Sequence, residues 1–299
     1  MAPGFHVLIF AGQPMSEYAN RTVRMIACII LAVSVWCGVS NAYVLQGPQV
    51  LELMTKNMGS AKRLIVFQSL QLFDPQQESR TIEFNETLRY NFPDRFRSDI
   101  VSDNARRIHV MSAGDTITIM DEQISPETET RFNAYKDVIL CPGGHDFGKR
   151  LARLGIDVSI SSLGKFQNDV AYVIGARYPD VSESQIWIDK TSFRPFRWLL
   201  KHSKGTSAAD GLEIRYRQWQ KTGKIWYPMI TDFFISGRLI RKVNVKRIEV
   251  NPVFPDDTFD INQLKSRYQP SEQPVLTQPE TVPANEIQQT IENFNKIYE

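Results

Sequence analysis

Residues 212–250 read LEIRYRQWQKTGKIWYPMITDFFISGRLIRKVNVKRIEV, and this stretch decides the fold class. The polarity of the side chains repeats with a period near two through Leu212–Gln220, Trp226–Ile235 and Leu239–Val250, which is typical of β-strands. The connections, residues 221–224 and 236–238, each contain a glycine, which tolerates the positive φ of a tight hairpin turn. Three long antiparallel strands joined by hairpins are therefore expected.

The same period recurs upstream of this stretch. The further predicted strands are Leu64–Leu72, Ile82–Tyr90, Ile108–Met111, Thr116–Met120, Thr130–Tyr135, Val170–Arg177, Gln185–Asp189 and Arg197–Lys201. Two segments instead have apolar residues at helical spacing: Pro48–Gly59, which begins with a proline, and Asp146–Leu154, which is followed by Gly155. The sequence thus predicts an α+β fold dominated by an antiparallel sheet.

The two ends of the chain differ from this body. From Arg21 to Ala42, a basic segment, a short apolar run and small residues follow one another, which predicts a signal peptide cleaved after Ala42 and export to the periplasm. The body is expected over 43–265. Residues 266–299 form a Pro/Gln-rich linker that ends in a short predicted helix near Asn285–Tyr298. In the mature chain Cys141 is the single cysteine, so no internal disulfide is expected.

Composition and motifs exclude several classes of function. With 42% apolar and 23% charged residues, the chain is neither disordered nor a multi-span membrane protein. Lys and Arg total 35 against 33 Asp and Glu, so no general attraction to nucleic acid is expected. Nucleophile, metal-protease and phosphate-loop motifs are absent from the sequence, and Cys141 with His145 supplies at most half a metal site. We therefore expect no enzyme activity, no catalytic residue, no metal and no cofactor.

Apolar side chains on both faces of Trp226–Ile235 indicate that something covers the second face of the sheet. Helices over a filled core are one explanation, and a curved sheet that holds a lipid-like ligand is the other. Basic residues between Arg194 and Arg247 fit either a rim for anionic headgroups or solvated strand faces.

Three short stretches resemble the LolA-like superfamily of exported lipoprotein carriers: Asn91–Arg97 with its central Pro93, Gln185–Lys190 followed by Arg194-Pro195, and Ile248–Pro252 followed by Phe259. The resemblance implies a strongly curved antiparallel sheet, an incomplete β-barrel, whose concave face is covered by helices and accepts acyl chains. It also implies a basic lid residue directly before Pro93. Phe92 stands there in this chain, so Arg95 or Arg97 is the candidate for the rim or lid.

The leading hypothesis is a non-catalytic periplasmic carrier of lipoprotein acyl chains or another lipid, with membrane donor and acceptor proteins as partners. The predicted lining residues are Phe84, Leu88, Phe96, Ile117, Ile119, Ile174, Trp187, Trp198, Tyr216 and Phe233. The alternative is a periplasmic sensor or scaffold that uses the same half-barrel to bind a protein partner, with Ile287–Ile297 as the docking helix. The same helix could instead fold back over the sheet as an additional lid.

Overall fold

A computed structural model describes residues 44–73, 81–102, 106–126, 131–140, 143–201 and 211–270. All of them belong to the structural unit that begins at Val44. The predicted signal peptide, the Cys141 thiol and the helix near Asn285–Tyr298 lie outside the described residues. In the part of the chain that is described, no helix is long and apolar enough to cross a bilayer.

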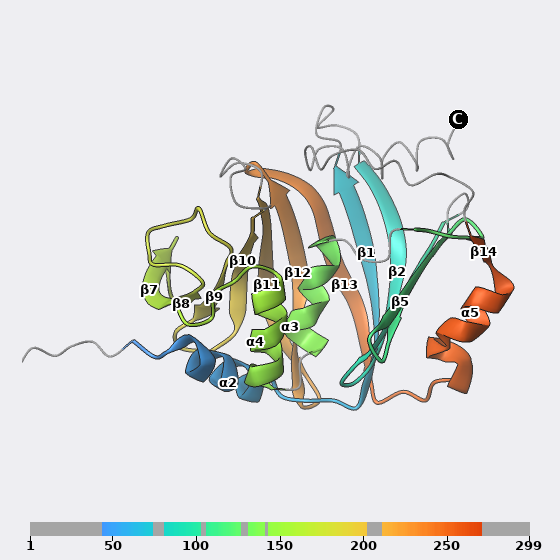
Figure 1. The fold of residues 1–299 in the computed structure, drawn as a ribbon, viewed down its shortest axis with the longest axis horizontal. Coiled ribbons are helices and arrows are strands. Elements are labelled where there is room, and N and C mark those ends of the chain that lie inside the picture. Colours follow the sequence, from blue (N-terminus) through green and yellow to red (C-terminus); the bar gives the residue numbers. More distant parts are fainter. Residues whose placement is uncertain are drawn as a thin grey trace, which may run out of the picture. The chain divides into compact units, whose positions relative to one another are not determined.

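A 14-stranded sheet that is not closed into a barrel forms the framework (Figure 1). Its order is β14-β6-β5-β4-β3-β2-β1-β13-β12-β11-β10-β9-β8-β7. The strands on one side of the centre are β1 (Arg63–Phe73), β2 (Thr81–Asn91), β3 (Arg95–Val101), β4 (Arg106–Ser112), β5 (Asp115–Met120), β6 (Gln123–Ile124) and β14 (Gln269–Pro270). Those on the other are β7 (Ser161–Phe166), β8 (Asp169–Ile174), β9 (Gln185–Asp189), β10 (Pro195–Leu200), β11 (Leu212–Thr222), β12 (Ile225–Ile235) and β13 (Arg238–Val250). The predicted α+β antiparallel architecture is confirmed.

Hairpin chemistry explains the neighbours in this order. Thr222 pairs with Ile225 around Gly223, whose φ is +62°, and Ile235 pairs with Arg238 around Ser236 and Gly237. Positive φ at the turn matches the twist of the flanking strands, so each strand returns beside the one before it. The two central strands are not joined by a hairpin, because β1 pairs with β13, which is distant in the sequence, from Leu64↔Val250 to Leu72↔Arg241.

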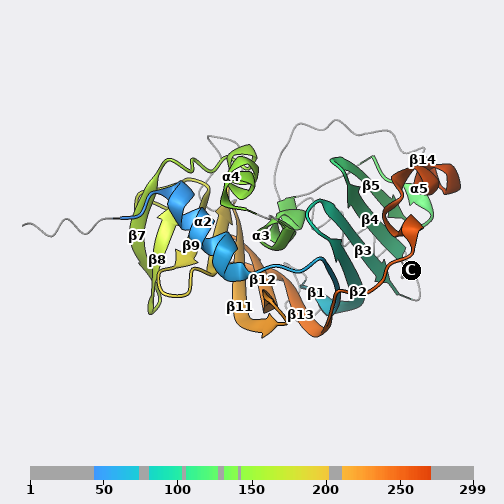
Figure 2. The ribbon, with the colours of Figure 1, turned by 90° about the horizontal axis from the view of Figure 1, so that it is seen from below.

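Helical segments cover one face of the sheet, which we call the concave face (Figure 2). They are α2 (Gly47–Met58), the 3₁₀ helix η1 (Arg131–Lys136), α3 (Asp137–Leu140) and α4 (Gly144–Arg153). On the opposite, convex face, η3 (Asp256–Phe259) and α5 (Ile261–Arg267) lie against β3, β4 and β5. Both helices expected within residues 43–265 are present, as α2 and α4.

One predicted strand is wrong. Within the segment predicted as Thr130–Tyr135, the described residues 131–135 belong to η1, which lies on the sheet instead of joining it. Its Ala134 and Tyr135 are buried in the same core as the strand residues below. The sequence had also not predicted β3, β7 or α5. A cap signal for α5 is present, because the Asp260 side chain accepts a hydrogen bond from the Gln263 backbone N–H at 3.0 Å.

Curvature of the sheet is evident from a contact between two tyrosines. Tyr90 lies on β2 and Tyr227 on β12, with β1 and β13 between them. A flat sheet would hold these strands about 14 Å apart, yet the two hydroxyl oxygens are 3.0 Å apart and buried. The sheet therefore curves, so that side chains from β2 and from β12 approach one another on its concave face.

Candidate ligand-binding surface

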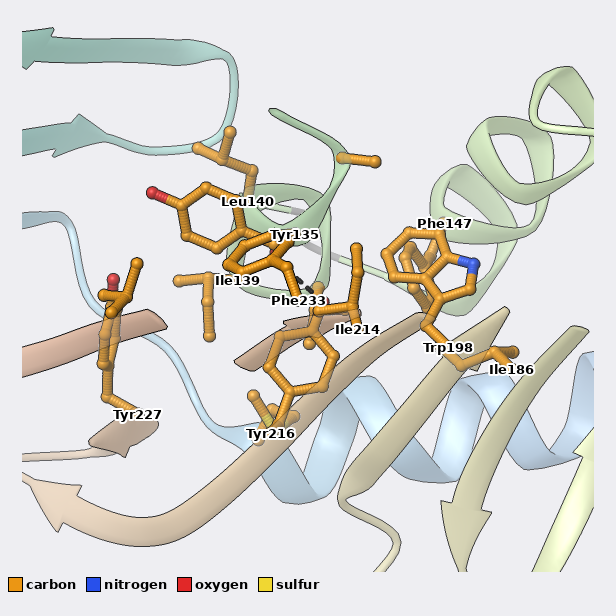
Figure 3. Close-up of a cluster of buried hydrophobic side chains, with 14 of the residues drawn as sticks. Tyr135, Ile139, Leu140, Phe147, Ile186, Trp198, Ile214, Tyr216, Tyr227 and Phe233 are labelled. Carbon is orange, nitrogen blue, oxygen red and sulfur yellow. Dashed lines mark hydrogen bonds between the residues drawn. The ribbon is translucent and has the colours of Figure 1, made fainter. Parts of the chain in front are cut away.

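A row of apolar side chains crosses four neighbouring strands on the concave face. Trp198 of β10 pairs with Ile186 of β9 and Ile214 of β11, and Ile214 pairs with Phe233 of β12. All four are fully buried. Paired residues point to the same face of a sheet, so these side chains form one continuous surface beneath the helices (Figure 3). We call this row the apolar half.

Rings from the covering helices rest on the apolar half. Phe147 of α4 meets Trp198 edge-on at 6.1 Å between ring centroids, and Tyr135 of η1 meets Phe233 in the same way at 5.6 Å. The Tyr216 hydroxyl donates to the Tyr135 carbonyl oxygen at 3.2 Å. Figure 3 shows Tyr135 and Phe147 above strand residues that come from below. The cover is thus made of separate helical pieces held mainly by aromatic and apolar contacts.

Close approach of α2 and α4 depends on one glycine. A Cβ at Gly144 would lie 2.5 Å from the Glu52 backbone nitrogen and 2.7 Å from its Cα. These distances are too short for a Cβ next to backbone atoms, so any larger residue at this position would push α4 away from α2. Gly144 therefore sets how closely the two covering helices meet.

Over β1–β5, one row of polar side chains crosses the same face among apolar neighbours, and it is just as buried. The Gln68 amide donates to Glu86 at 2.6 Å, and the Ser98 hydroxyl donates to the other Glu86 oxygen at 2.5 Å. His109 Nδ1 and the Thr118 hydroxyl oxygen are 2.9 Å apart. We call these five residues the polar half. The two halves meet beneath η1, where burial raises the pKa of Tyr135 well above its ordinary value and the nearby Glu86 raises it further.

Burial also determines the protonation state of His109. Its pKa falls from 6.5 to about 3 because desolvation disfavours the cation, and Arg107 and Lys136 lower it further. The imidazole is therefore neutral at physiological pH. Its Nε2 atom has no hydrogen-bond partner among the described residues.

The register assigns the predicted lining residues to different faces. Seven of them belong to the core beneath the helices: Phe84, Leu88, Phe96, Ile174, Trp198, Tyr216 and Phe233. Ile117 and Ile119 instead pair with Val110 and Ile108, and these four pack under α5 on the convex face. Trp187 pairs with Arg197, one position away from the Trp198 row, and it packs with Phe166 and Phe196. These three residues are left out of the ligand surface.

Neither predicted lid arginine is on the concave face. Arg95 and Arg97 alternate with the inward-facing Phe96 along β3, so they point to the convex side. Arg97 bonds Asp99 at 2.9 Å and the Thr258 carbonyl oxygen at 2.9 Å. This placement ties Arg97 to η3 and turns it away from the helices that cover the apolar half.

Sequence analysis did not find several residues of this surface. The polar half, together with Tyr135 and Phe147, was absent from the predicted lining. A signal for Phe147 was present, because it lies at helical spacing with Leu151 and Leu154. No comparable signal marked Glu86 or His109, because a lone polar residue in an alternating strand is expected to face water.

A charged pocket of about 340 Å³ lies between the β2–β3 turn and α4, and none of its lining residues belongs to the apolar half or the polar half. It is lined by Pro93, Asp94, Asp146, Lys149, Arg150 and Arg153. Such a lining suits water and ions, not an acyl chain.

The sequence matches no model of a known protein family and no curated protein. Solved structures do match. A LolA superfamily protein from Nitrosomonas europaea aligns with a TM-score of 0.50 at 12% identity, over 74% of this chain and 100% of that one. The chain has a LolA-like fold. An outer membrane lipoprotein-sorting protein domain from Vibrio parahaemolyticus aligns at 0.49 with 11% identity, over 73% of this chain and 97% of that one. A DUF1329 family protein from Desulfovibrio piger aligns at 0.49 with 10% identity, over 73% and 98%.

Proposed function

We propose that this LolA-like chain is a non-catalytic periplasmic carrier that binds the acyl chains of lipoproteins or other lipids and moves them toward the outer membrane. The observation that carries the proposal is the apolar half, a continuous buried surface of Ile186, Trp198, Ile214 and Phe233. Helical pieces cover it instead of a second sheet, and pieces of this kind can move without breaking the strand ladder.

Burial energetics support this role. Each buried methylene contributes about 0.8 kcal/mol, so a twelve-carbon chain gains about 9 kcal/mol before ordering costs. An entering chain must replace the contacts that Phe147 and Tyr135 make with the row. Because the acyl chain replaces apolar contacts that the protein already makes, the net free energy of binding is smaller than the gain from burial alone. A small net value suits a carrier that must also release its cargo.

Tryptophan fluorescence provides a direct test, because Trp198 and Trp187 lie on opposite faces of the same pair of strands. Brominated fatty acids quench indole emission at short range. We expect them to quench the wild-type protein, and the Trp198→Phe variant to lose most of that quenching. Trp187→Phe is the matched control and should keep it.

Two outcomes would count against the carrier. One is no quenching in the wild-type protein by any brominated acyl chain. The other is equal quenching of both variants, which would place the probe away from the apolar half. Native mass spectrometry of protein from a periplasmic extract, searched for a co-purifying lipid, tests export and cargo together.

A further inference from the structure

Two arginines lie on the concave face among buried residues. Arg241 of β13 pairs with Phe233 of β12 and Leu72 of β1, both inward-facing. Arg107 of β4 pairs with the buried Ile100 of β3. Both arginines are partly buried. A guanidinium keeps its charge at physiological pH, and each N–H group that is buried needs a hydrogen-bond acceptor.

The convex arginines have such partners. Arg197 and Arg215 bond one Glu213 oxygen at 2.7 and 2.6 Å, and Arg217 bonds Asp232 at 2.5 Å. In contrast, no ion pair joins Arg107 or Arg241 to a carboxylate of the described residues. The Arg241 guanidinium lies 4.9 Å from the Phe233 ring centroid and 5.7 Å from that of Tyr135. Its Nε atom has no acceptor among the described residues.

Glu86 is the nearby carboxylate, and both of its oxygens already accept hydrogen bonds from Gln68 and Ser98. Arg107 and Arg241 lie near this single carboxylate. Burial lowers the pKa of Arg107; Glu86 opposes this effect and Arg241 adds to it. The polar half therefore has more positive than negative charge among the described residues that face it.

Unsatisfied polar atoms mark the same region. Besides Arg241 Nε, they include Gln68 Oε1, His109 Nε2 and Asn133 Nδ2, which have no hydrogen-bond partner among the residues that the structure describes. Gln68, His109 and Asn133 are all more than nine-tenths buried. Native proteins leave few such atoms, so a cluster of them beside surplus positive charge points to a polar ligand group.

We propose that the cargo is an anionic amphiphile, whose carboxylate or phosphate group is held by Arg107 and Arg241 in the polar half while its acyl chain lies along the apolar half. The proposal rests on the carrier function argued above. The planar guanidinium matches both oxyanions, with paired N–H donors directed at two oxygens. Asn133 and Lys136 come from η1, so the same helical piece that covers the apolar half also borders the anion.

The test measures binding of three ten-carbon probes to the full chain: decanoate, decyl phosphate and decanol. We expect both anions to bind at least about tenfold more tightly than decanol, as one or two charge-assisted hydrogen bonds imply. Arg107→Gln and Arg241→Gln should each lower the affinity for the anions and leave that for decanol unchanged. Arg215→Gln, on the convex face, is the matched control and should change neither.

Arg241→Lys keeps the charge and should retain most of the preference for anions, which separates charge recognition from a packing defect. Equal affinity of the wild-type protein for all three probes would overturn the proposal without any variant. Competition by inorganic phosphate as strong as that by decyl phosphate would also overturn it, because the site would then take a free anion. If decanol also fails to bind, the carrier function itself fails, and that result is distinct from a loss of anion preference.

Discussion

The apolar half and the polar half of the concave face are parts of one sheet, under one set of helices, and equally buried. Trp198 and Phe233 on one side, and Glu86 and His109 on the other, are each at most 3% exposed. Burial of a polar residue stabilises a fold only when its hydrogen bonds are complete. The apolar half is explained by stability, although Trp198 Nε1 lacks a hydrogen-bond partner among the described residues. In and beside the polar half, Gln68, His109, Asn133 and Arg241 each leave such an atom, and burial alone does not explain them.

The largest expected effect lies in the apolar half. Trp198→Ala removes the centre of the row and leaves a cavity beneath Phe147, so we expect the free energy of unfolding to fall by about 3–5 kcal/mol. Urea denaturation followed by circular dichroism measures this loss. Ser98→Ala is the comparison in the polar half and should cost about 1–3 kcal/mol, because it leaves one buried Glu86 oxygen without its donor. A larger loss for Ser98→Ala would break the distinction between the halves.

The second prediction concerns pH. The unfolded chain protonates His109 near pH 6.5, while the folded chain resists protonation until about pH 3. Below pH 6.5 the unfolded state therefore binds the extra proton, and stability falls as the pH falls. Between pH 7.5 and pH 5 this histidine should cost the fold about 2 kcal/mol.

Urea midpoints across that pH range, compared with those of His109→Gln, give the measurement. The variant should show a flatter loss of stability on acidification. Parallel pH profiles for the two proteins would mean that His109 is not held neutral by the polar half.

The smallest expected effect is at the contact that joins the two sides of the concave face. Tyr90→Phe and Tyr227→Phe each remove one hydroxyl of the pair 3.0 Å apart. A double-mutant cycle should give a coupling energy of about 1 kcal/mol. A coupling near zero would show that the curvature does not depend on this bridge.

Much of the sheet could be predicted from the sequence, because hairpin glycines and period-two strands are local signals. The strands from Leu212 to Val250 follow that prediction. The segment Thr130–Tyr135 does not, since its Tyr135 packs onto the sheet from above and no local pattern distinguishes that from pairing at an edge.

The faces of the candidate site were harder to predict, and β5 shows why. Its sequence, Asp-Thr-Ile-Thr-Ile-Met, suggests that the isoleucines face the core. They do face a core, but it is the one under α5, and α5 was not predicted. Thr118 consequently turns toward His109 on the concave face. When both faces of a strand are buried, alternation alone does not tell which face is concave.

Pairing of β1 with β13 has a consequence for the order of folding. The two strands at the middle of the sheet come from opposite ends of the described body, Leu64 opposite Val250. The hairpins from β2 to β6 and from β7 to β12 need only local contacts, but the two groups of strands can join only after the last long strand, β13, has been synthesised. Contacts so distant in sequence form slowly. Until then β1 and β12 each present an open edge, and a chain cut short before Arg238 is expected to aggregate through those edges.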